Sequence, residues 1–401
     1  MKTNRRILAL LLALVMVLGL MTGCASGKTE TAAPETAQTE TAPAEEAAAE
    51  ETASAEETAA EETAPAEEAA FETVEFTDSL GRTVTLPADI TRIAPSGAVA
   101  TMMLAAIAPE CMVTVNATPS DRQMAFLSSN LASLPETGQM YGSKANLNLE
   151  TLLSANPQVV IDLGGKKGDM AADLDALQEQ IGIPVIFLEA DLPHMAAAFR
   201  TLGGLLSGKA DRGEAIASLI DRTTAMAAEN AAKITDDMRV CAMYTTGEDG
   251  LGTNAAGSVQ AQVLDLVGVE NAVVVEDVTN KGGGNIISLE QLYNFDPDVI
   301  LFDVNSIYET VADDPAWAQL TAISTGKYYE VPGSPYSWLS GPPSMNMILG
   351  VWWLGNLVYP EIYDYDMSEM TQEIYKTLWN YDLTAEETAA LLGNSTLKAA
   401  Q

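Results

Sequence analysis

The phrase "NLETLLSANPQVVIDLG" occupies residues 148–164, and a second version of it, "SLEQLYNFDPDVILFDV", occupies residues 288–304. In both, a Leu-Glu pair starts a short helical pattern, a Pro follows the Glu by seven residues, and an apolar run comes next. Pro ends a helix, and a short apolar run beyond it is typical of a buried strand. The chain therefore repeats one helix-to-strand unit at an interval of 140 residues.

The sequence around the two phrases alternates between strand-like and helix-like patterns. A hairpin is predicted at residues 74–87, and further strands near residue 93 and at "CMVTVNAT", residues 111–118. Such alternation predicts an α/β fold with two Rossmann-like lobes and mostly parallel sheets. A helical pattern between the lobes predicts one long bridging helix of roughly 37 Å. We expect an N-terminal lobe at 73–209, this helix at 210–235 and a C-terminal lobe at 236–401.

The beginning of the chain has the features of a secretory signal. Lys2, Arg5 and Arg6 precede an apolar run at residues 7–20, which is short for a membrane span. The small residues before Cys24 resemble the lipobox of bacterial lipoproteins. We expect a signal peptide at 1–23 and acyl chains, palmitate included, on Cys24, which would anchor the chain to the outer face of the cytoplasmic membrane. A plain signal peptide and an uncleaved anchor helix are the alternatives.

Residues 24–72 differ in composition from the rest of the chain. They consist largely of Ala, Glu, Thr and Pro, with 14 Glu and a single Lys in residues 25–72. Such a segment has too little apolar surface to offset the entropy of ordering, and its like charges repel one another. We expect a disordered acidic linker that holds the folded part away from the membrane. A helical stalk is the alternative.

Charge and residue types exclude several functions. The net charge of −36 opposes nucleic acid binding, which needs basic surface. The chain has one His, His194, so a metal site built from several imidazoles is excluded, and no nucleophile stands in a recognisable motif. Cys111 and Cys241 lie in different halves and are expected to be buried and unpaired. Nothing in the sequence indicates an enzyme.

Polar and aromatic residues gather where the predicted strands end. In α/β sheets, ligands bind beyond the carboxyl ends of the strands, so these loops predict a cleft lined by both lobes. Aromatic side chains suit a large planar or greasy ligand, and lysines suit its anionic groups. The candidate ligand-binding residues are Ser96, Tyr141, Lys144, Lys166, Tyr244, Tyr308, Tyr336 and Trp338, with Lys167 beside Lys166.

Five segments in a specific order resemble a known family. They are "FTDSLGRTVTLPADITRIAPSGAVATMML", "NLETLLSANPQVVID", "SVQAQVLDLVGVENAV", "SLEQLYNFDPDVILF" and "YYEVP". Together they resemble the substrate-binding lipoproteins of ATP-driven (ABC) importers for ferric siderophores, haem and cobalamin. That resemblance implies two lobes joined by a single long helix, a ligand between the lobes and only a small closing motion.

The resemblance also implies a role for the Glu of each repeated phrase. In the cobalamin-binding member, the equivalent Glu of each lobe pairs with Arg on a permease subunit. We therefore expect Glu150 and Glu290 to dock this chain onto a permease dimer that works with an ATPase. A Glu in the first turn also stabilises its own helix by roughly 0.3–1 kcal/mol, and both roles are compatible.

The expected function is that of a non-enzymatic, monomeric receptor at the cell surface. It would capture a chelated metal compound, with a ferric siderophore first and haem or cobalamin next, and would need no cofactor. One rival is a receptor for molybdate or tungstate, which would use backbone N–H groups and Ser96. The other rival is a surface enzyme or sensor with the same two-lobed fold.

Overall fold

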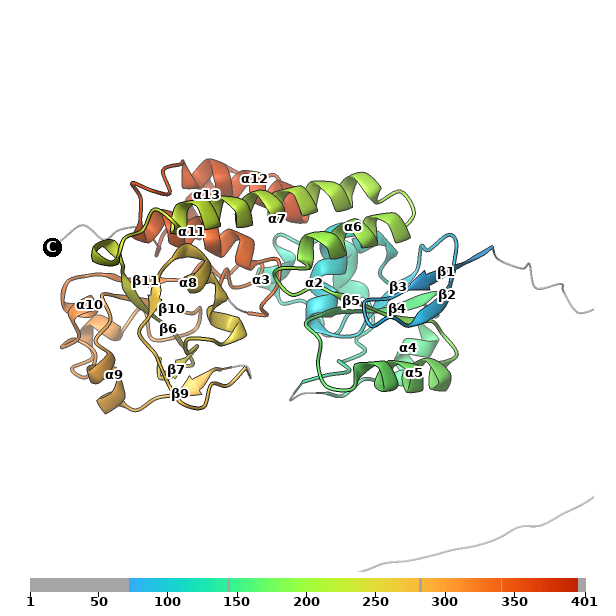
Figure 1. Cartoon of the computed structure of the whole chain (residues 1–401), viewed down its shortest axis with the longest axis horizontal. Helices are drawn as coiled ribbons and strands as arrows, with labels where there is room; N and C mark the ends of the chain where they lie inside the picture. The colour runs from blue at the N-terminus through green and yellow to red at the C-terminus, as the bar shows by residue number, and fades with distance from the viewer. Residues whose placement is uncertain (1–71, 143–144, 281–282, 340, 396–401) are drawn as a thin grey trace, which may run out of the picture. The chain divides into compact units, whose positions relative to one another are not determined.

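The computed structural model describes residues 72–142, 145–280, 283–339 and 341–395. These residues form two α/β lobes, drawn in blue to green and in yellow to red in Figure 1. The predicted hairpin is confirmed as the antiparallel pair β1 (Thr73–Thr77) and β2 (Thr83–Pro87). The predicted signal peptide, Cys24, nearly all of the acidic linker, and Lys144 lie outside the described residues.

The N-terminal lobe is built on a parallel sheet. Its strands lie in the order β3 (Ile93–Pro95), β4 (Val159–Gly164) and β5 (Val185–Glu189). All six residues of β4 are buried, which explains why its sequence is almost entirely apolar. The helices of this lobe are α2 (Ala98–Ile107), α3 (Asp121–Met124), α4 (Leu149–Ser154), α5 (Met170–Ile181) and α6 (Met195–Leu205).

The strand predicted at residues 111–118 is wrong. That stretch makes only two isolated bridges, from Met112 to Ile93 and from Val115 to Glu136. Its side chains are nonetheless buried at Cys111, Met112 and Val115, so the apolar pattern reflects core packing rather than a paired strand.

The C-terminal lobe has a mixed sheet. Its strands β6 (Cys241–Thr246), β10 (Val299–Phe302) and β11 (Tyr328–Glu330) are parallel, and β8 (Glu270–Asn271) pairs with β6 in parallel. The short strands β7 (Gly252–Thr253) and β9 (Asn285–Ile286) are antiparallel additions. The helices are α8 (Gln262–Val267), α9 (Leu289–Phe295), α10 (Thr321–Ser324), α11 (Met347–Val358), α12 (Met367–Trp379) and α13 (Ala385–Leu392).

The repeated phrase has the same geometry in both lobes. It forms α4 and β4 in the first lobe, and α9 and β10 in the second. Each helix is capped by the residue before its Leu-Glu pair: the side chain of Asn148 accepts from the N–H of Thr151, and that of Ser288 from the N–H of Gln291. After each helix the backbone turns left-handed, at Asn156 and at Asp296, immediately before the Pro.

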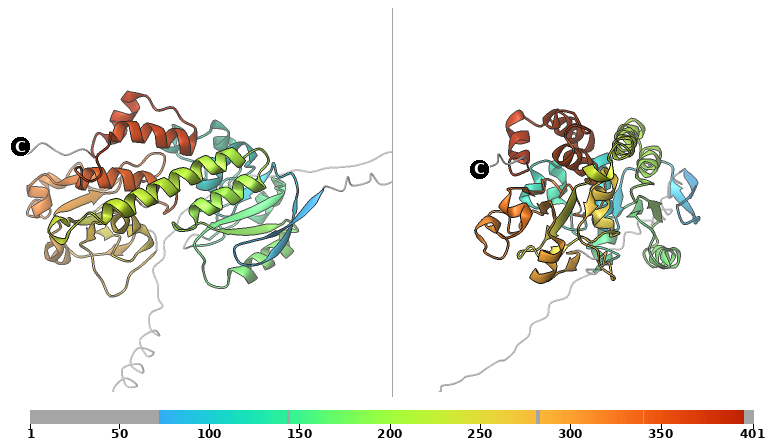
Figure 2. Two further views of the ribbon diagram at one scale, coloured as in Figure 1. Left: turned by 45° about the horizontal axis from the view of Figure 1, so that its top comes forward. Right: turned by 60° about the vertical axis from the view of Figure 1, so that its left-hand side comes forward.

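Helix α7 (Ala210–Ala231) connects the lobes and runs alongside both of them, as Figure 2 shows. It pairs closely with α6, because Gly203 and Gly213 let the two backbones approach; a Cβ on Gly213 would lie 2.5 Å from the carbonyl oxygen of Phe199. On the C-terminal side, Thr223 accepts a hydrogen bond from the indole of Trp352 at 2.8 Å. Both lobes therefore pack against one rigid element.

Candidate functional site

A cleft of about 650 Å³ is lined by residues of both lobes. On the N-terminal side it lies at the carboxyl ends of β3, β4 and β5, where the sheet leaves loops of small and polar residues. On the other side it is lined by Val259 and Gln260 in the turn before α8, by Gln262 at the start of α8, and by Pro343 and Met347 near the start of α11. This volume is typical of a site for a drug-sized ligand.

The start of α2 forms one wall of the cleft. Gly97 is the N-cap residue, has no side chain to satisfy the first N–H groups, and lines the cleft together with Ala98, Val99 and Ala100. A Cβ on Gly97 would lie 3.2 Å from the Cβ of Gln139, so a larger residue here would crowd the wall. Among the described residues, no side chain caps the first turn of α2, whose N–H groups lie beside the cleft.

Asp162 is a buried carboxylate next to that turn. Its Oδ1 accepts a hydrogen bond from the Ser96 hydroxyl, and its Oδ2 has no partner among the described residues. Burial raises the pKa of Asp162, against the lowering influence of the Ser96 hydrogen bond and the Lys167 charge. Because Ser96 donates its hydrogen to Asp162, that hydrogen is not available to an anionic ligand.

Tyr141 and Lys167 contribute an aromatic and basic part of the lining. The Lys167 ammonium lies 5.1 Å from the centre of the Tyr141 ring, within the range of a cation–π contact. The Tyr141 hydroxyl is buried. Burial, helped by the Asp162 and Asp173 carboxylates, raises the pKa of this hydroxyl, so it stays protonated, and a ligand would compete with Asp173 for its hydrogen.

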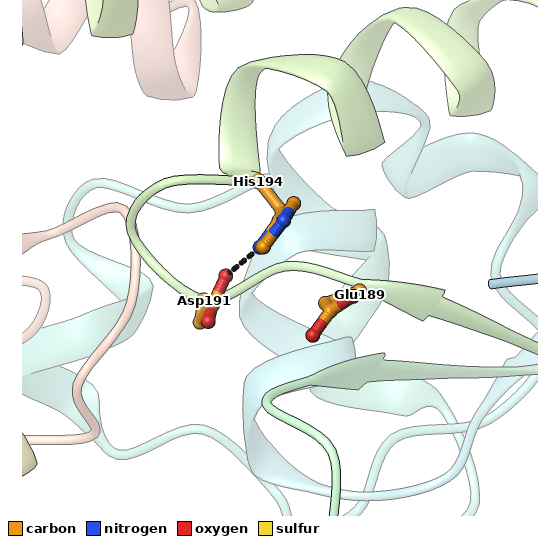
Figure 3. A group of neighbouring side chains, drawn as sticks. All are labelled: Glu189, Asp191 and His194. Carbon is orange, nitrogen blue, oxygen red and sulfur yellow. Dashed lines mark hydrogen bonds and ion pairs between the residues drawn. The ribbon is translucent and has the colours of Figure 1, made fainter. Parts of the chain in front are cut away.

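A third group lies where β5 leads into α6. Glu189 ends the strand, Asp191 follows it, and His194 is the N-cap residue of α6. Figure 3 shows His194 and Asp191 joined by a hydrogen bond, with Glu189 beside them. Nδ1 of His194 lies 2.5 Å from Oδ1 of Asp191, and Nζ of Lys166 lies 2.8 Å from Oε2 of Glu189. Of these, Lys166, Glu189 and Asp191 line the cleft.

The structure brings some of the sequence candidates together and separates others. Ser96, Tyr141 and Lys166 all line the cleft. The four aromatic candidates of the C-terminal lobe lie elsewhere. Tyr244 and Trp338 are fully buried, and Tyr336 is nearly so. Tyr308 packs beside Phe302 and Tyr328.

Hydrogen bonds inside the C-terminal lobe explain why two of these aromatic side chains are buried away from the cleft. The Tyr244 hydroxyl donates to Asp303 at 2.9 Å, and the Trp338 indole donates to the carbonyl oxygen of Ser334 at 3.3 Å. Both polar groups are therefore satisfied inside the lobe. Sequence reasoning missed Asp162, Glu189 and Asp191, although the same strand-end argument that selected the aromatic residues also applies to them.

The two repeated glutamates lie on exposed helices. Glu150 and Glu290 are each the second residue of a short helix, are exposed, and form no salt bridge among the described residues. Three residues after each Glu comes an exposed large apolar side chain, Leu153 in one lobe and Tyr293 in the other, with 45% and 39% of their surface exposed. Both helices therefore offer one carboxylate and one apolar group at matching positions.

The described part of the chain contains no helix that combines the length and the apolar character needed to cross a bilayer. Cys111 and Cys241 are free, and burial raises the pKa of the Cys241 thiol to about 11.

Comparisons with known proteins support the two-lobed α/β fold. The Fe(3+)-citrate-binding protein YfmC of Bacillus subtilis is 22% identical over 193 residues, which is 47% of this chain and 58% of the length of that protein. The structure of an ABC transporter solute binding protein from Sulfurospirillum deleyianum is 28% identical, with a TM-score of 0.72 over 80% of this chain and 99% of that one.

The molybdate periplasmic binding protein MolA of Haemophilus influenzae shares the fold, with a TM-score of 0.63 and 19% identity over 78% of this chain and 99% of that one. A family model described as periplasmic binding protein matches residues 103–335, more than half of the sequence. This chain belongs to the periplasmic binding protein family.

Proposed function

We propose that this chain is the lipid-anchored solute-binding component of an ATP-driven importer, and that it captures a chelated metal compound, a ferric siderophore first. The observation that carries the proposal is the cleft of about 650 Å³ between the lobes. Its volume suits a chelate of several hundred daltons and is much larger than a bare ion needs. The Fe(3+)-citrate-binding relative supports iron chelates as the class to test first.

The polar groups of the cleft support a ligand that both accepts and donates hydrogen bonds. The Tyr141 hydroxyl and the Lys167 ammonium are donors, whereas Asp162 and Glu189 are acceptors. A siderophore offers hydroxyl or amide donors together with anionic oxygens, so it can use both sets. Haem and cobalamin remain the next ligands to test.

A molybdate or tungstate receptor is less well supported. The N–H groups of the first turn of α2, which no side chain of the described residues caps, would suit an oxyanion. Ser96, however, donates to Asp162, and a buried carboxylate beside the same turn repels an anion unless it is protonated. The MolA likeness, at 19% identity, concerns the fold alone.

Docking on a permease is the second part of the proposal. Glu150 and Glu290 are exposed and without ion-pair partners among the described residues, which supports contact with basic residues on another protein. Leu153 and Tyr293 add an apolar contact beside each carboxylate. A permease dimer with paired basic and apolar positions would fit both helices.

Thermal unfolding of the full chain, in the presence of one ligand class at a time, tests the proposal. The panel is ferric hydroxamate and catecholate siderophores, ferric citrate, haemin, cobalamin and molybdate. A ligand present at 100 times its Kd stabilises the folded state by about 2.7 kcal/mol, which gives a clear rise in Tm. We expect a saturable rise with one iron chelate. Stabilisation by molybdate alone would overturn the ligand assignment.

A further inference from the structure

The corner of the cleft formed by Glu189, Asp191 and His194 combines the ligand types of a metal site. Each side chain offers one ligand atom, and these atoms all lie within 4.8 Å of one another. The three come from one short segment, the end of β5 and the turn into α6, so the backbone itself brings them together (Figure 3). One imidazole with two carboxylates suits first-row transition metals.

The corner holds a hydrogen bond and an ion pair where a metal would lie. A hydrogen bond joins Nδ1 of His194 and Oδ1 of Asp191, 2.5 Å apart, so its proton lies between the two atoms. The Lys166 ammonium lies against Glu189 at 2.8 Å. A divalent ion would take the place of that proton and of that ammonium, and the nitrogen and oxygen would separate to about 3 Å to accept bonds of 2.0–2.2 Å.

The corner is also accessible. The side chains of His194 and Asp191 are 51% and 39% exposed, and that of Glu189 is 19% exposed. Glu189 and Asp191 line the cleft, so an ion held here would face its interior. Three protein ligands fill only part of a coordination sphere, which leaves positions open toward the cleft.

We propose that Glu189, Asp191 and His194 form a binding site for a divalent transition metal ion such as Zn²⁺ or Ni²⁺, with open coordination positions that face the cleft. The site itself is independent of the proposed function. What fills the open positions rests on that function: oxygen or nitrogen donors of a metal compound whose own chelator leaves coordination positions free.

Lys166 allows a second test of the proposal, because its ammonium would compete with the metal for the Glu189 carboxylate. Removing the imidazole should weaken metal binding, whereas removing this ammonium should strengthen it. A merely structural role for the cluster predicts neither change. Since His194 is the one His in the chain, every imidazole signal and every imidazole modification reports on this corner alone.

The experiment uses the full chain without a polyhistidine tag, stripped of metal with a chelator. Zn²⁺ or Ni²⁺ alone is titrated by calorimetry at neutral pH. We expect one saturable site, a loss of affinity of at least tenfold in His194→Ala and in Asp191→Asn, and a severalfold gain in Lys166→Met. Glu179→Gln, an exposed carboxylate on α5, is the matched control and should bind as the parent chain does.

The imidazole resonances of His194, followed by NMR, provide a second measurement that does not depend on a variant that folds. Saturating Zn²⁺ should shift them and should block modification of the ring by an acylating reagent. Unchanged resonances, or equal metal affinity in His194→Ala, would overturn the site. A chain that binds the metal but no ferric chelate would keep this site and refute the proposed function instead.

Discussion

The two lobes build the same helix-to-strand unit but end it differently. In the N-terminal lobe the strand carries Asp162, whose one oxygen accepts from Ser96 while the other has no partner among the described residues. In the C-terminal lobe the strand leads to Asp303, which accepts from Tyr244 at 2.9 Å and from Ser337 at 2.8 Å. Asp162 lines the cleft, and the hydrogen-bonded Asp303 is not among the lining residues.

The two lobes share one framework, but they do not contribute equally to the lining of the cleft. The N-terminal lobe supplies most of the polar lining of the cleft, whereas the C-terminal lobe uses the polar and aromatic groups near its strand ends for its own hydrogen bonds. On the outer surface, in contrast, the lobes remain equivalent, because each presents a Glu and an apolar residue at the same positions.

The largest expected effect concerns the exposed Glu that each lobe presents, Glu150 and Glu290. We expect Glu150→Arg combined with Glu290→Arg to lower ligand uptake by cells on the order of 100-fold, since each Arg would repel the basic residues that we propose on the permease. The affinity of the purified chain for the same ligand should not change. Uptake of the labelled iron chelate that raises the Tm provides the measurement.

The matched control for that test is Glu179→Arg with Glu309→Arg, one exposed Glu in each lobe. It makes the same charge change away from α4 and α9, so uptake should stay close to that of the parent chain. Normal uptake by the Glu150→Arg, Glu290→Arg variant would show that the two Glu residues of the repeated phrase do not dock the chain onto a permease.

The next effect separates the two aspartates. We expect Asp303→Ala to lower the free energy of unfolding by about 2–3 kcal/mol, because it removes the carboxylate to which the buried hydroxyls of Tyr244 and Ser337 both donate. Asp162→Ala should cost about 1 kcal/mol and should weaken ligand binding about tenfold or more. Denaturant unfolding and calorimetry measure the two. Equal stability losses, with no change in affinity, would contradict the division of work between the lobes.

The pH dependence of stability should differ between the same two positions. Burial raises the pKa of the Asp162 and Asp303 carboxyl groups in the folded state. The folded state therefore binds these protons more tightly than the unfolded state does, and each protonated group stabilises the fold at acid pH. That stabilisation is lost as the pH rises through the folded-state pKa. Asp162→Asn should therefore gain stability relative to the parent chain between pH 4 and pH 7. Asp303→Asn should gain less, because two hydroxyl donors already favour its ionised form. Unfolding midpoints across this pH range give the comparison.

The smallest effect tests the helix caps. Asn148→Ala and Ser288→Ala should each lower the free energy of unfolding by about 1 kcal/mol, since each removes the acceptor for an N–H of the first turn. Ser154→Ala, an exposed position at the end of α4, should leave stability nearly unchanged. If neither substitution lowers the free energy of unfolding, packing alone holds α4 and α9 in place.

Much of the fold could be predicted because its signals are local. The Pro and Val positions of the repeated phrase, together with Leu152 and Leu292, are buried in both lobes, and an apolar pattern of that kind is visible in the sequence. The "CMVTVNAT" prediction was wrong because burial without strand pairing produces the same apolar pattern.

The lining of the cleft was harder to predict, because it depends on which way a side chain turns after a strand ends. Tyr244 and Trp338 follow the sequence rule for ligand contacts, yet hydrogen-bond partners inside the lobe hold them there. His194 looked isolated in the sequence, since its neighbours Asp191 and Glu189 become a cluster only when β5 turns into α6.

Helix α7 has a consequence for how a ligand is received. It contains no Pro, and its one Gly, Gly213, is packed against α6, so it has no built-in point of bending. Arg212 also ties carbonyl oxygens of α2 and α12 together. The cleft is thus shaped before the ligand arrives, and most of its ordering entropy is lost during folding rather than during capture. We therefore expect a ligand to bind at a rate limited by encounter, since α7 offers no hinge for a slow rearrangement of the lobes.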